Sequence, residues 1–399
     1  MNIFLCATIC IFVVVLFFMV LMFCKIKALS RMVMELKNQS KEFQEDTKIY
    51  ENLKVDVIVL EMGKNLLRFE NKLSDKINIL RQKFADELGY IVPEVKIREN
   101  NNLAVDEIAI MVHDLRVLKT TIYSDRLLTL LFDYEKNNQN VPSDKIPAVG
   151  AYNKEVCWIT KKDYHKLSKS IQSKEAIDVI IDFLEEIIIE KVDDILSVKE
   201  VYKYIKYVKE NYSSEVVDVV LGEISVNKFK EILTHLLREK ISIKDINFIF
   251  DKLSGIVQYS QSPCLLAEMI RTFLSQQILN RNAIYNTLFA IVISPAWEKL
   301  LQESCDETEL GHILLLSPPQ MQYFIDDFMS VLSKATKDIN FQPVVLCTPK
   351  VRYALFSLLS RYVPDIAVIA YSELLPKLEI QALDTIGNND SYEKIVNME

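Results

Sequence analysis

The sequence predicts a multidomain α+β protein with a single N-terminal transmembrane helix. The chain opens on an apolar run, and a strand-helix-strand-strand order follows it. A purely helical stretch then leads into a second region in which strands and helices alternate. With 399 residues, 50% of them hydrophobic, the part after the apolar run is large enough for two or three compact units.

Residues 1–24 are predicted to be the membrane anchor. The run 3–24 is interrupted only by Thr8 and contains neither Pro nor Gly, so as a helix it matches a hydrocarbon layer ~30 Å thick. Three basic residues follow it directly and predict that the rest of the chain is cytoplasmic: Lys25, Lys27 and Arg31. The alternative is a cleaved signal peptide, but no basic stretch precedes the run and no small-residue cleavage site follows Cys24.

Residues 25–54 are predicted to form a helical linker. Leu29, Leu36, Phe43 and Tyr50 repeat every seven residues, whereas the companion positions near 39 and 46 are polar. Because only one of the two seam positions of a coiled coil is apolar here, two interpretations stay open: a solvated linker and a segment that self-associates.

The next elements are a strand at 55–60, an amphipathic helix, and strands at 91–98 and 107–117. The strand residues at 55–60 are mostly β-branched. The helix is predicted to end at Gly89, which supplies its C-cap. Its buried face is Leu73, Ile77, Leu80, Phe84 and Leu88.

Residues 133–173 break this regularity and are predicted to be a compact insertion, because Pro142, Pro147 and Gly150 are typical of turns and loops. From 174 to about 280 the chain reads as helical throughout, and 177–189 is apolar on most faces. Ser225 is a candidate N-cap, and Ser242 opens a capping-box pattern before a further helix.

The last unit alternates between strands and helices, which implies a mixed or parallel sheet covered by helices. Ser294 and Thr348 each place a capping hydroxyl before a proline. Residues after Ile386 are polar and are expected to be loose. The predicted strands are 288–293, 343–347, 366–370 and 377–382, and the predicted helices start at Pro295 or cover 319–332 and 350–362.

Composition argues against several classes of function. A net charge of −8 disfavours nucleic acid as a partner, and only seven glycines leave little material for phosphate-binding loops. Cysteines and histidines of the soluble part are scattered without metal-binding or catalytic spacing, so no metal, cofactor or enzymatic activity is predicted. These residues are Cys157, Cys264, Cys305, Cys347, His113, His165, His235 and His312.

Several strings along the chain form a recognisable series. The first three are DVIVLEMG at 56–63, LRQKFADELGYIVPEVKIR at 80–98 and YSDRLL at 123–128. Further strings of the series stand at 236–245, 294–301, 343–352, 362–365 and 371–374. In this order they are similar to the cytoplasmic domain of the export-gate family of flagella and type III secretion, FHIPEP. The resemblance covers roughly residues 55–387.

This resemblance implies four subdomains. The first is an α+β sandwich at 55–132 plus 174–192, and the second is inserted into it at 133–173. The third subdomain, at 193–280, is helical, and the fourth, at 281–385, is α/β. A tail covers 386–399. It also implies a docking platform without catalytic activity, cytoplasmic and typically a nonameric ring, which binds secretion chaperones, exported substrates and other export-apparatus proteins. Family members have many membrane spans where this chain shows one, which predicts a single-pass protein of the inner membrane.

The resemblance assigns chaperone or substrate docking to one stretch and its surroundings. Where the family has an acidic residue and an aromatic one, this chain has Ile146 and Val149. An apolar shelf without the aromatic anchor would bind a hydrophobic helix more weakly. The alternative is that Val149 and Ile159 pack the insertion onto the first subdomain. The candidate residues are Ile146, Pro147, Val149, Gly150, Trp158 and Ile159.

The family's ring contacts point to the connection 238–245, so Arg238, Lys244 and Asp245 are the candidate ring-interface residues. Charges on such a turn can equally be solvated, and exposed pairs contribute only ~0–1 kcal/mol each. Two other functions stay open. One is a membrane-tethered adaptor that kept the fold but lost ring assembly and export, and the other is an enzyme that uses the region of Cys305 and His312.

Overall fold

The computed structural model describes residues 55–137, 139–167, 170–308, 311–336, 341–388 and 390–398, together with Met22, Lys25, Lys27, Met32 and Met34. It divides into two units, Met1–Asp56 and Val57–Glu399. The five described residues of the N-terminal stretch are helical, and the predicted anchor and linker otherwise lie outside the described residues. Where the structure is described, it contains no helix with the length and apolar character needed to cross a membrane.

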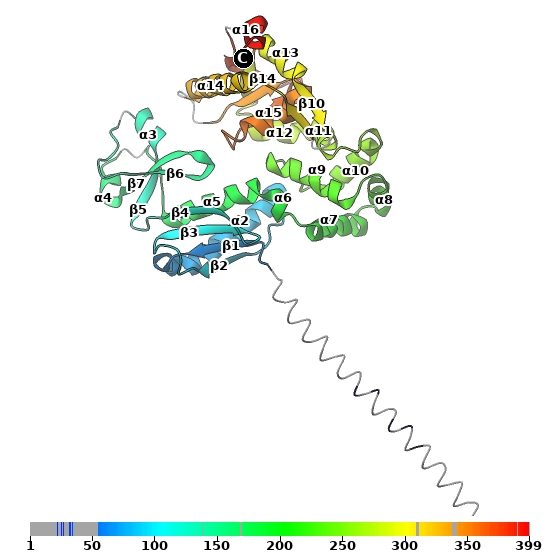
Figure 1. The fold of residues 1–399 in the computed structure, drawn as a ribbon, viewed down its shortest axis with the longest axis horizontal. Helices are drawn as coiled ribbons and strands as arrows, with labels where there is room; N and C mark the ends of the chain where they lie inside the picture. The colour runs from blue at the N-terminus through cyan, green and yellow to red at the C-terminus, as the bar shows by residue number, and fades with distance from the viewer. Residues whose placement is uncertain are drawn as a thin grey trace, which may run out of the picture. The chain divides into compact units, whose positions relative to one another are not determined.

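The first sheet of the larger unit has four strands in the order β2-β1-β3-β4 (Figure 1). β1 (Ile58–Met62) is parallel to β2 (Val95–Glu99) and antiparallel to β3 (Glu107–Val112), and β4 (Leu115–Thr121) is the edge strand beside β3. The prediction of one strand over 107–117 is therefore wrong. His113 and Asp114 adopt φ values of 50° and 61° and turn the chain back into β4.

Two long helices pack against each other beside this sheet (Figure 1). α2 (Glu70–Leu88) follows the short helix η1 (Lys64–Phe69) and buries all five predicted apolar residues. Gly89 closes α2 in the left-handed conformation at φ 67°, which confirms the predicted C-cap. α5 (Ala176–Glu190) is buried on most faces, as its apolar composition predicts.

The second sheet is antiparallel in the order β6-β7-β5-β8. Its strands are β5 (Arg126–Leu130), β6 (Ile146–Val149), β7 (Glu155–Thr160) and β8 (Ser173–Lys174), with the short helices α3 (Leu131–Lys136), η2 (Ala151–Asn153) and α4 (Lys161–Tyr164). β5 lies inside the range 55–132 but pairs in this sheet rather than in the first. A small core of its own contains Tyr134, Cys157, Ile159 and Ile171.

A helical region follows. Its helices are α6 (Val192–Ile195), α7 (Val198–Asn211), α8 (Ser214–Glu223), α9 (Val226–Arg238), α10 (Ile246–Ile256), η3 (Val257–Tyr259), α11 (Pro263–Phe273) and α12 (Ser275–Asn282). The Ser225 cap is confirmed, since its side chain accepts from the Lys228 N–H. The Ser242 capping prediction is wrong, because α10 begins one turn later and Asp245 accepts the capping bond from Phe248.

The C-terminal region is built on a parallel sheet in the order β13-β12-β9-β14. Its strands are β9 (Thr287–Ile293), β12 (Val344–Cys347), β13 (Val368–Ala370) and β14 (Glu379–Ile386), and its helices are α13 (Pro295–Glu303), α14 (Pro318–Thr336), η4 (Pro349–Val351), α15 (Arg352–Leu359) and η5 (Tyr371–Glu373). The Ser294 cap is confirmed, whereas Thr348 makes no capping bond and its hydroxyl accepts from Gln302.

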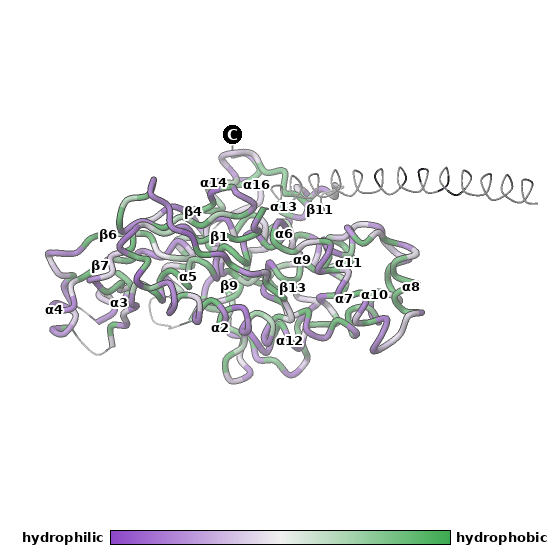
Figure 2. Tube along the Cα trace, turned by 90° about the horizontal axis from the view of Figure 1, so that it is seen from below, coloured by the Kyte–Doolittle hydropathy of each residue, from purple (hydrophilic) through white to green (hydrophobic). Residues whose placement is uncertain are grey.

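Two C-terminal elements differ from expectation. Residues that carried no predicted strand form the hairpin β10 (Cys305–Thr308) and β11 (Gly311–Leu314). The tail prediction is wrong for 390–398, where α16 (Tyr392–Val396) buries Ile395 and the Trp297 indole donates to Asp390. Hydrophobic and hydrophilic stretches are interleaved along the whole described chain (Figure 2).

Candidate functional site

A groove of about 530 Å³ lies between the first and second sheets. We call it the β4/β6 groove. Two strands and one helix supply most of its lining, and the residues are Val117, Leu118, Lys119, Thr120, Thr121, Tyr123, Ile146, Pro147, Ala148, Val149, Gly150, Asn153, Trp158, Phe183, Glu186, Ile187 and Glu190.

Consecutive residues of each strand line this groove, 117–121 of β4 and 146–149 of β6. Successive side chains of a strand point to opposite faces of its sheet, so a cavity beside one face would be lined by alternate residues only. A cavity lined by every residue lies beside the edge of the strand. Each of the two strands is indeed the last one in its sheet.

The floor of the groove is largely apolar. α5 contributes the buried side chains of Phe183 and Ile187, and β7 contributes Trp158, whose ring meets that of Tyr123 edge-on at 5.7 Å between centroids. Glu186 and Glu190, also on α5, are the exceptions. Burial raises the pKa of the Glu186 carboxyl group and Glu190 adds to this, whereas a backbone hydrogen bond from Tyr152 and the charges of Lys240 and Lys154 oppose it.

Five of the six predicted docking residues line the groove, and Ile159 does not. Trp158 and Ile159 are neighbours on β7, so their side chains leave the sheet on opposite faces. Ile159 therefore packs in the small core of the second sheet. Val149 is 64% exposed, which contradicts the alternative that it packs the insertion onto the first subdomain.

Sequence reasoning missed the β4 wall and the part of the floor that α5 supplies. Only the first three residues of β4 fell inside the single strand predicted for 107–117, and α5 was predicted only as a buried helix. Glu185 and Glu186 looked like a solvated acidic pair, but Lys83 bonds to Glu185 at 2.9 Å and Glu186 faces the groove. Local sequence carries no signal that β4 and α5 line the same groove, because tertiary packing brings the two sheets together.

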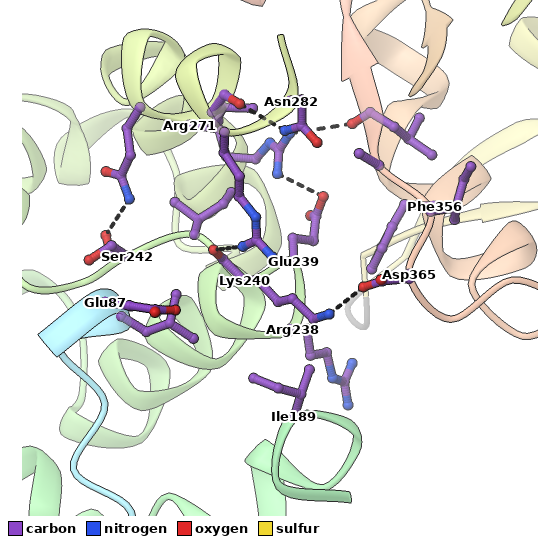
Figure 3. Close-up of a pocket in the computed structure, with 18 of the residues that line it drawn as sticks. Glu87, Ile189, Arg238, Glu239, Lys240, Ser242, Arg271, Asn282, Phe356 and Asp365 are labelled. Atoms are coloured by element: carbon purple, nitrogen blue, oxygen red, sulfur yellow. Dashed lines mark hydrogen bonds and ion pairs between the residues drawn. The ribbon is translucent and has the colours of Figure 1, made fainter. Parts of the chain in front are cut away.

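A second cavity of about 380 Å³, the junction pocket, lies among the end of α2, the turn after α9, the helices α11 and α12 and the loop before β13. Figure 3 shows the Lys240 side chain directed toward Asp365, with which it forms an ion pair. Lys240 also lies over the Tyr152 ring, 4.6 Å from its centroid. The pocket's charges are thus largely paired within the chain.

A buried ion cluster reaches the junction pocket through Glu239 and Arg271. Arg271 donates to Glu239 at 2.7 Å and to Glu373 at 2.9 Å, as Figure 3 shows for the first of these. Arg352, which is 0% exposed, donates to Glu239 at 2.8 Å and also pairs with Glu268. We call these two arginines and three carboxylates the Arg271/Arg352 cluster.

The cluster joins the helical region to the C-terminal region, because Glu239, Glu268 and Arg271 come from or just after α9 and α11, whereas Arg352 and Glu373 come from α15 and η5. Burial raises the pKa of Glu239. The Arg352 guanidinium instead holds the pKa of Glu268 below its usual range in spite of burial. Beside them, burial lowers the pKa of His235 to about 4, so this imidazole is neutral at pH 7.

The candidate ring-interface residues all have partners in their own chain. Arg238 pairs with Asp193. The Lys244 ammonium donates to the Asp86 carbonyl at 2.8 Å, and Asp245 caps α10. Arg238 lines the junction pocket, but Lys244 and Asp245 do not.

Among the described residues around Cys305 and His312, no catalytic arrangement is recognisable. Cys305 is buried, its thiol lies 3.5 Å from the Lys350 carbonyl, and burial raises the pKa of that thiol. His312 stands on the neighbouring strand of the same hairpin. Within the described residues no group of histidines, cysteines and carboxylates is arranged to hold a metal ion.

Comparison with known proteins assigns the chain to a family. A model of the FHIPEP family matches residues 2–379. The chain belongs to the FHIPEP family. It is 25% identical to the flagellar biosynthesis protein FlhA of Bacillus subtilis over 363 residues, which are 89% of this chain and 53% of that protein. It thus spans about half the length of the FlhA proteins it matches.

Two solved structures of proteins similar to this chain share its fold. The CdsV protein of Chlamydia pneumoniae, solved in complex with CdsO, superposes with a TM-score of 0.72 at 23% identity, covering 84% of this chain and 98% of that one. Nonameric SctV-C of EPEC superposes with a TM-score of 0.68 at 19% identity, covering 83% and 98%. These similarities confirm a mixed α/β multidomain fold of the export-gate type.

Proposed function

We propose that this FHIPEP chain is a non-enzymatic docking platform of a flagellar or type III secretion apparatus, and that the β4/β6 groove binds complexes of secretion chaperones with exported substrates. The observation that carries this proposal is the position of the groove. Residues that the family resemblance marks for docking meet there, on an apolar floor and beside an exposed lip at Val149.

The chemistry of the groove supports a protein ligand rather than a small metabolite. Its floor includes apolar side chains, and its walls are the edges of two strands, whose main-chain groups can pair with a polypeptide. An aromatic anchor is absent from the lip, since Val149 occupies that place. Aromatic residues dominate binding energy at such interfaces, so affinity for an apolar partner is expected to be modest.

Substitutions at Val149 test this function. Val149→Phe is expected to strengthen binding of a chaperone–substrate complex from the same genome about ten-fold, because it adds an aromatic anchor beside the floor. Val149→Asp is expected to weaken binding at least ten-fold, because it places a charge against apolar surface. Isothermal titration calorimetry with the purified chain measures both dissociation constants.

The matched control is Leu115→Asp, which also introduces an acidic residue at an exposed apolar position but outside the groove. It is expected to leave binding unchanged. Equal affinities for the Val149→Asp and Val149→Phe variants would exclude the groove as the docking site.

We also propose that the chain assembles as a ring and is held at the inner membrane by residues 1–24, with its bulk in the cytoplasm. The fold similarity to nonameric SctV-C supports a ring of nine copies. Light scattering of the detergent-solubilised chain over a wide range of concentrations is expected to show a species of nine chains. A strict monomer at every concentration would contradict the ring.

The second candidate is a membrane-tethered adaptor that kept the fold but not ring assembly or export. It is favoured by one observation: Arg238, Lys244 and Asp245 all bond within their own chain. The same measurement of mass separates the two functions, because the adaptor would bind its partner as a monomer.

A further inference from the structure

We propose that the β4/β6 groove takes an extended segment of an exported polypeptide, which pairs as an additional strand with the free edge of β4 and places a basic side chain beside Glu186. This inference rests on the proposed docking function and specifies its ligand. It is carried by the hydrogen-bond pattern of β4, by the composition of β6 and by the charge on the floor.

The register of β4 shows which of its backbone groups are free. The Ile122 N–H donates to the Asp106 carbonyl at 2.8 Å, next to the opposed residues Glu107 and Thr121. Bonded and non-bonded pairs alternate along an antiparallel ladder. Thr120 therefore bonds to β3, whereas Lys119 and Thr121 direct their N–H and C=O groups away from β3, and no other described strand pairs with them.

The opposite wall offers a poorer edge. The Gly150 N–H donates to the Lys154 carbonyl at 2.9 Å, so by the same alternation Pro147 and Val149 direct their backbone outward from β6. Pro147 has no N–H and interrupts the row of donors. An incoming strand consequently finds a complete set of donors and acceptors on β4 and an incomplete one on β6.

A helical ligand would fit this edge badly. A helix satisfies its own backbone groups, so it would cover the free groups of Lys119 and Thr121 without bonding to them. Each buried polar group left without a partner costs about 1–3 kcal/mol. A strand avoids this cost because it donates to and accepts from the edge.

The side chains around the groove define the ligand further. Residues 117–121 of β4 offer about 16 Å of edge at ~3.3 Å per residue, enough for roughly five residues of the ligand. Trp158, Phe183 and Ile187 favour apolar side chains on the face toward the floor. Lys240 and Lys154 favour the charged form of Glu186, but Glu186 forms no direct ion pair within the described residues, so a Lys or Arg of the ligand would add a directly bonded cation.

A synthetic peptide tests the inference. The probe is the fluorescein-labelled nonapeptide Thr-Val-Thr-Lys-Thr-Val-Thr-Val-Thr, in which lysine lies on the same face as the valines; it is titrated with the full chain and followed by fluorescence anisotropy. Thr121→Pro removes one edge N–H that β3 does not use, and it is expected to weaken binding about ten-fold or more. Thr121→Val keeps the N–H and is the matched control, with an expected change of less than two-fold. Glu186→Gln is expected to weaken the lysine peptide but not a peptide with norleucine in place of lysine.

Measurements on the unmodified protein make the test independent of how well Thr121→Pro folds. Two versions of the nonapeptide carry N-methyl groups on alternate residues, one set on each edge of the extended peptide. A strand pairs with β4 through one edge, so one version is expected to lose binding and the other to keep it. Equal binding by both versions, equal binding by the two Thr121 variants, or no binding of the unmodified peptide at millimolar concentration would each overturn the inference.

The outcome is separable from that of the docking function. If Val149→Asp weakens a chaperone–substrate complex whereas the nonapeptide does not bind, the groove is a docking site for another kind of segment and only the strand inference fails. If Val149→Asp leaves the complex unaffected, the docking function itself fails.

Discussion

Arg352→Met is expected to lower the free energy of unfolding by about 3–5 kcal/mol. The Arg352 guanidinium is fully buried and is shared between Glu239 and Glu268. Methionine fills a similar volume but leaves Glu239 with Arg271 alone and removes the arginine partner of Glu268. Removing one partner of a buried ion pair costs far more than the pair contributes, because the remaining charge stays desolvated.

Urea denaturation followed by tryptophan fluorescence measures this loss, since Trp297 lies in the same hydrophobic core as the neighbouring α15 residues. Arg361→Met is the matched control. Arg361 is exposed just beyond the end of α15, and the same substitution there is expected to change the free energy by less than about 0.5 kcal/mol. A loss below about 1 kcal/mol for Arg352→Met would show that the cluster does not hold the two regions together.

The second large effect is expected from Gly89→Ala, a loss of about 3 kcal/mol or more. Gly89 adopts φ 67°, a conformation that costs about 1 kcal/mol or more for a residue with a Cβ atom. A Cβ placed there would also lie 2.4 Å from the Lys244 Cα, so backbone would have to move. The same contact includes the hydrogen bond from the Ile243 N–H to the Leu88 carbonyl at 2.8 Å, which the substitution is expected to lengthen.

The control for Gly89 is a glycine with no steric role. Gly222 lies exposed in α8, and a Cβ there would have no neighbour within 4 Å. Gly222→Ala is expected to raise stability by about 0.5–1 kcal/mol, because alanine restricts the unfolded chain. Thermal denaturation monitored by circular dichroism should therefore show shifts of opposite sign for the two substitutions. Shifts of the same sign would contradict the role assigned to Gly89.

Sequence patterns correctly predicted the buried face of α2 and three helix caps, because each of these depends only on residues close by in the sequence. The five apolar residues of α2 recur with the helical period, and all five are buried. The caps at Gly89, Ser225 and Ser294 also follow from the residue itself and its immediate neighbours. In these cases the conformation and the burial are both specified within about one turn of helix.

Turns without a sequence signal were missed. The β3–β4 turn uses His113 and Asp114 at positive φ, where Asn-Gly or Asp-Gly would have marked a hairpin. The apolar run continues to Val112 on one side and resumes at Leu115 on the other, so the period alone reads as one strand. As a consequence, β4 and its free edge could not be predicted.

Predicting both walls of the β4/β6 groove would likewise have required knowledge of the tertiary structure. The resemblance predicted the β6 wall and Trp158, but the β4 wall depends on which strand ends the first sheet. The Arg271/Arg352 cluster is a further example. Its members stand between 3 and 134 positions apart in the sequence, from Glu239 to Glu373, and isolated charges of this kind are usually on the surface.

The way the chain enters and leaves the second sheet has a mechanical consequence. β5 and β8 pair with each other, with Leu128 opposite Lys174, so the two connections to the first sheet and α5 emerge side by side. A body attached through two adjacent linkers rotates most easily about the line through them. Leu128, Val156 and Trp158 of this sheet also pack in the main core, and β5 and η2 contact α5, so such a rotation would have to slide the sheet over α5. Because β6 belongs to that body and β4 does not, the packing on α5 fixes the width of the groove.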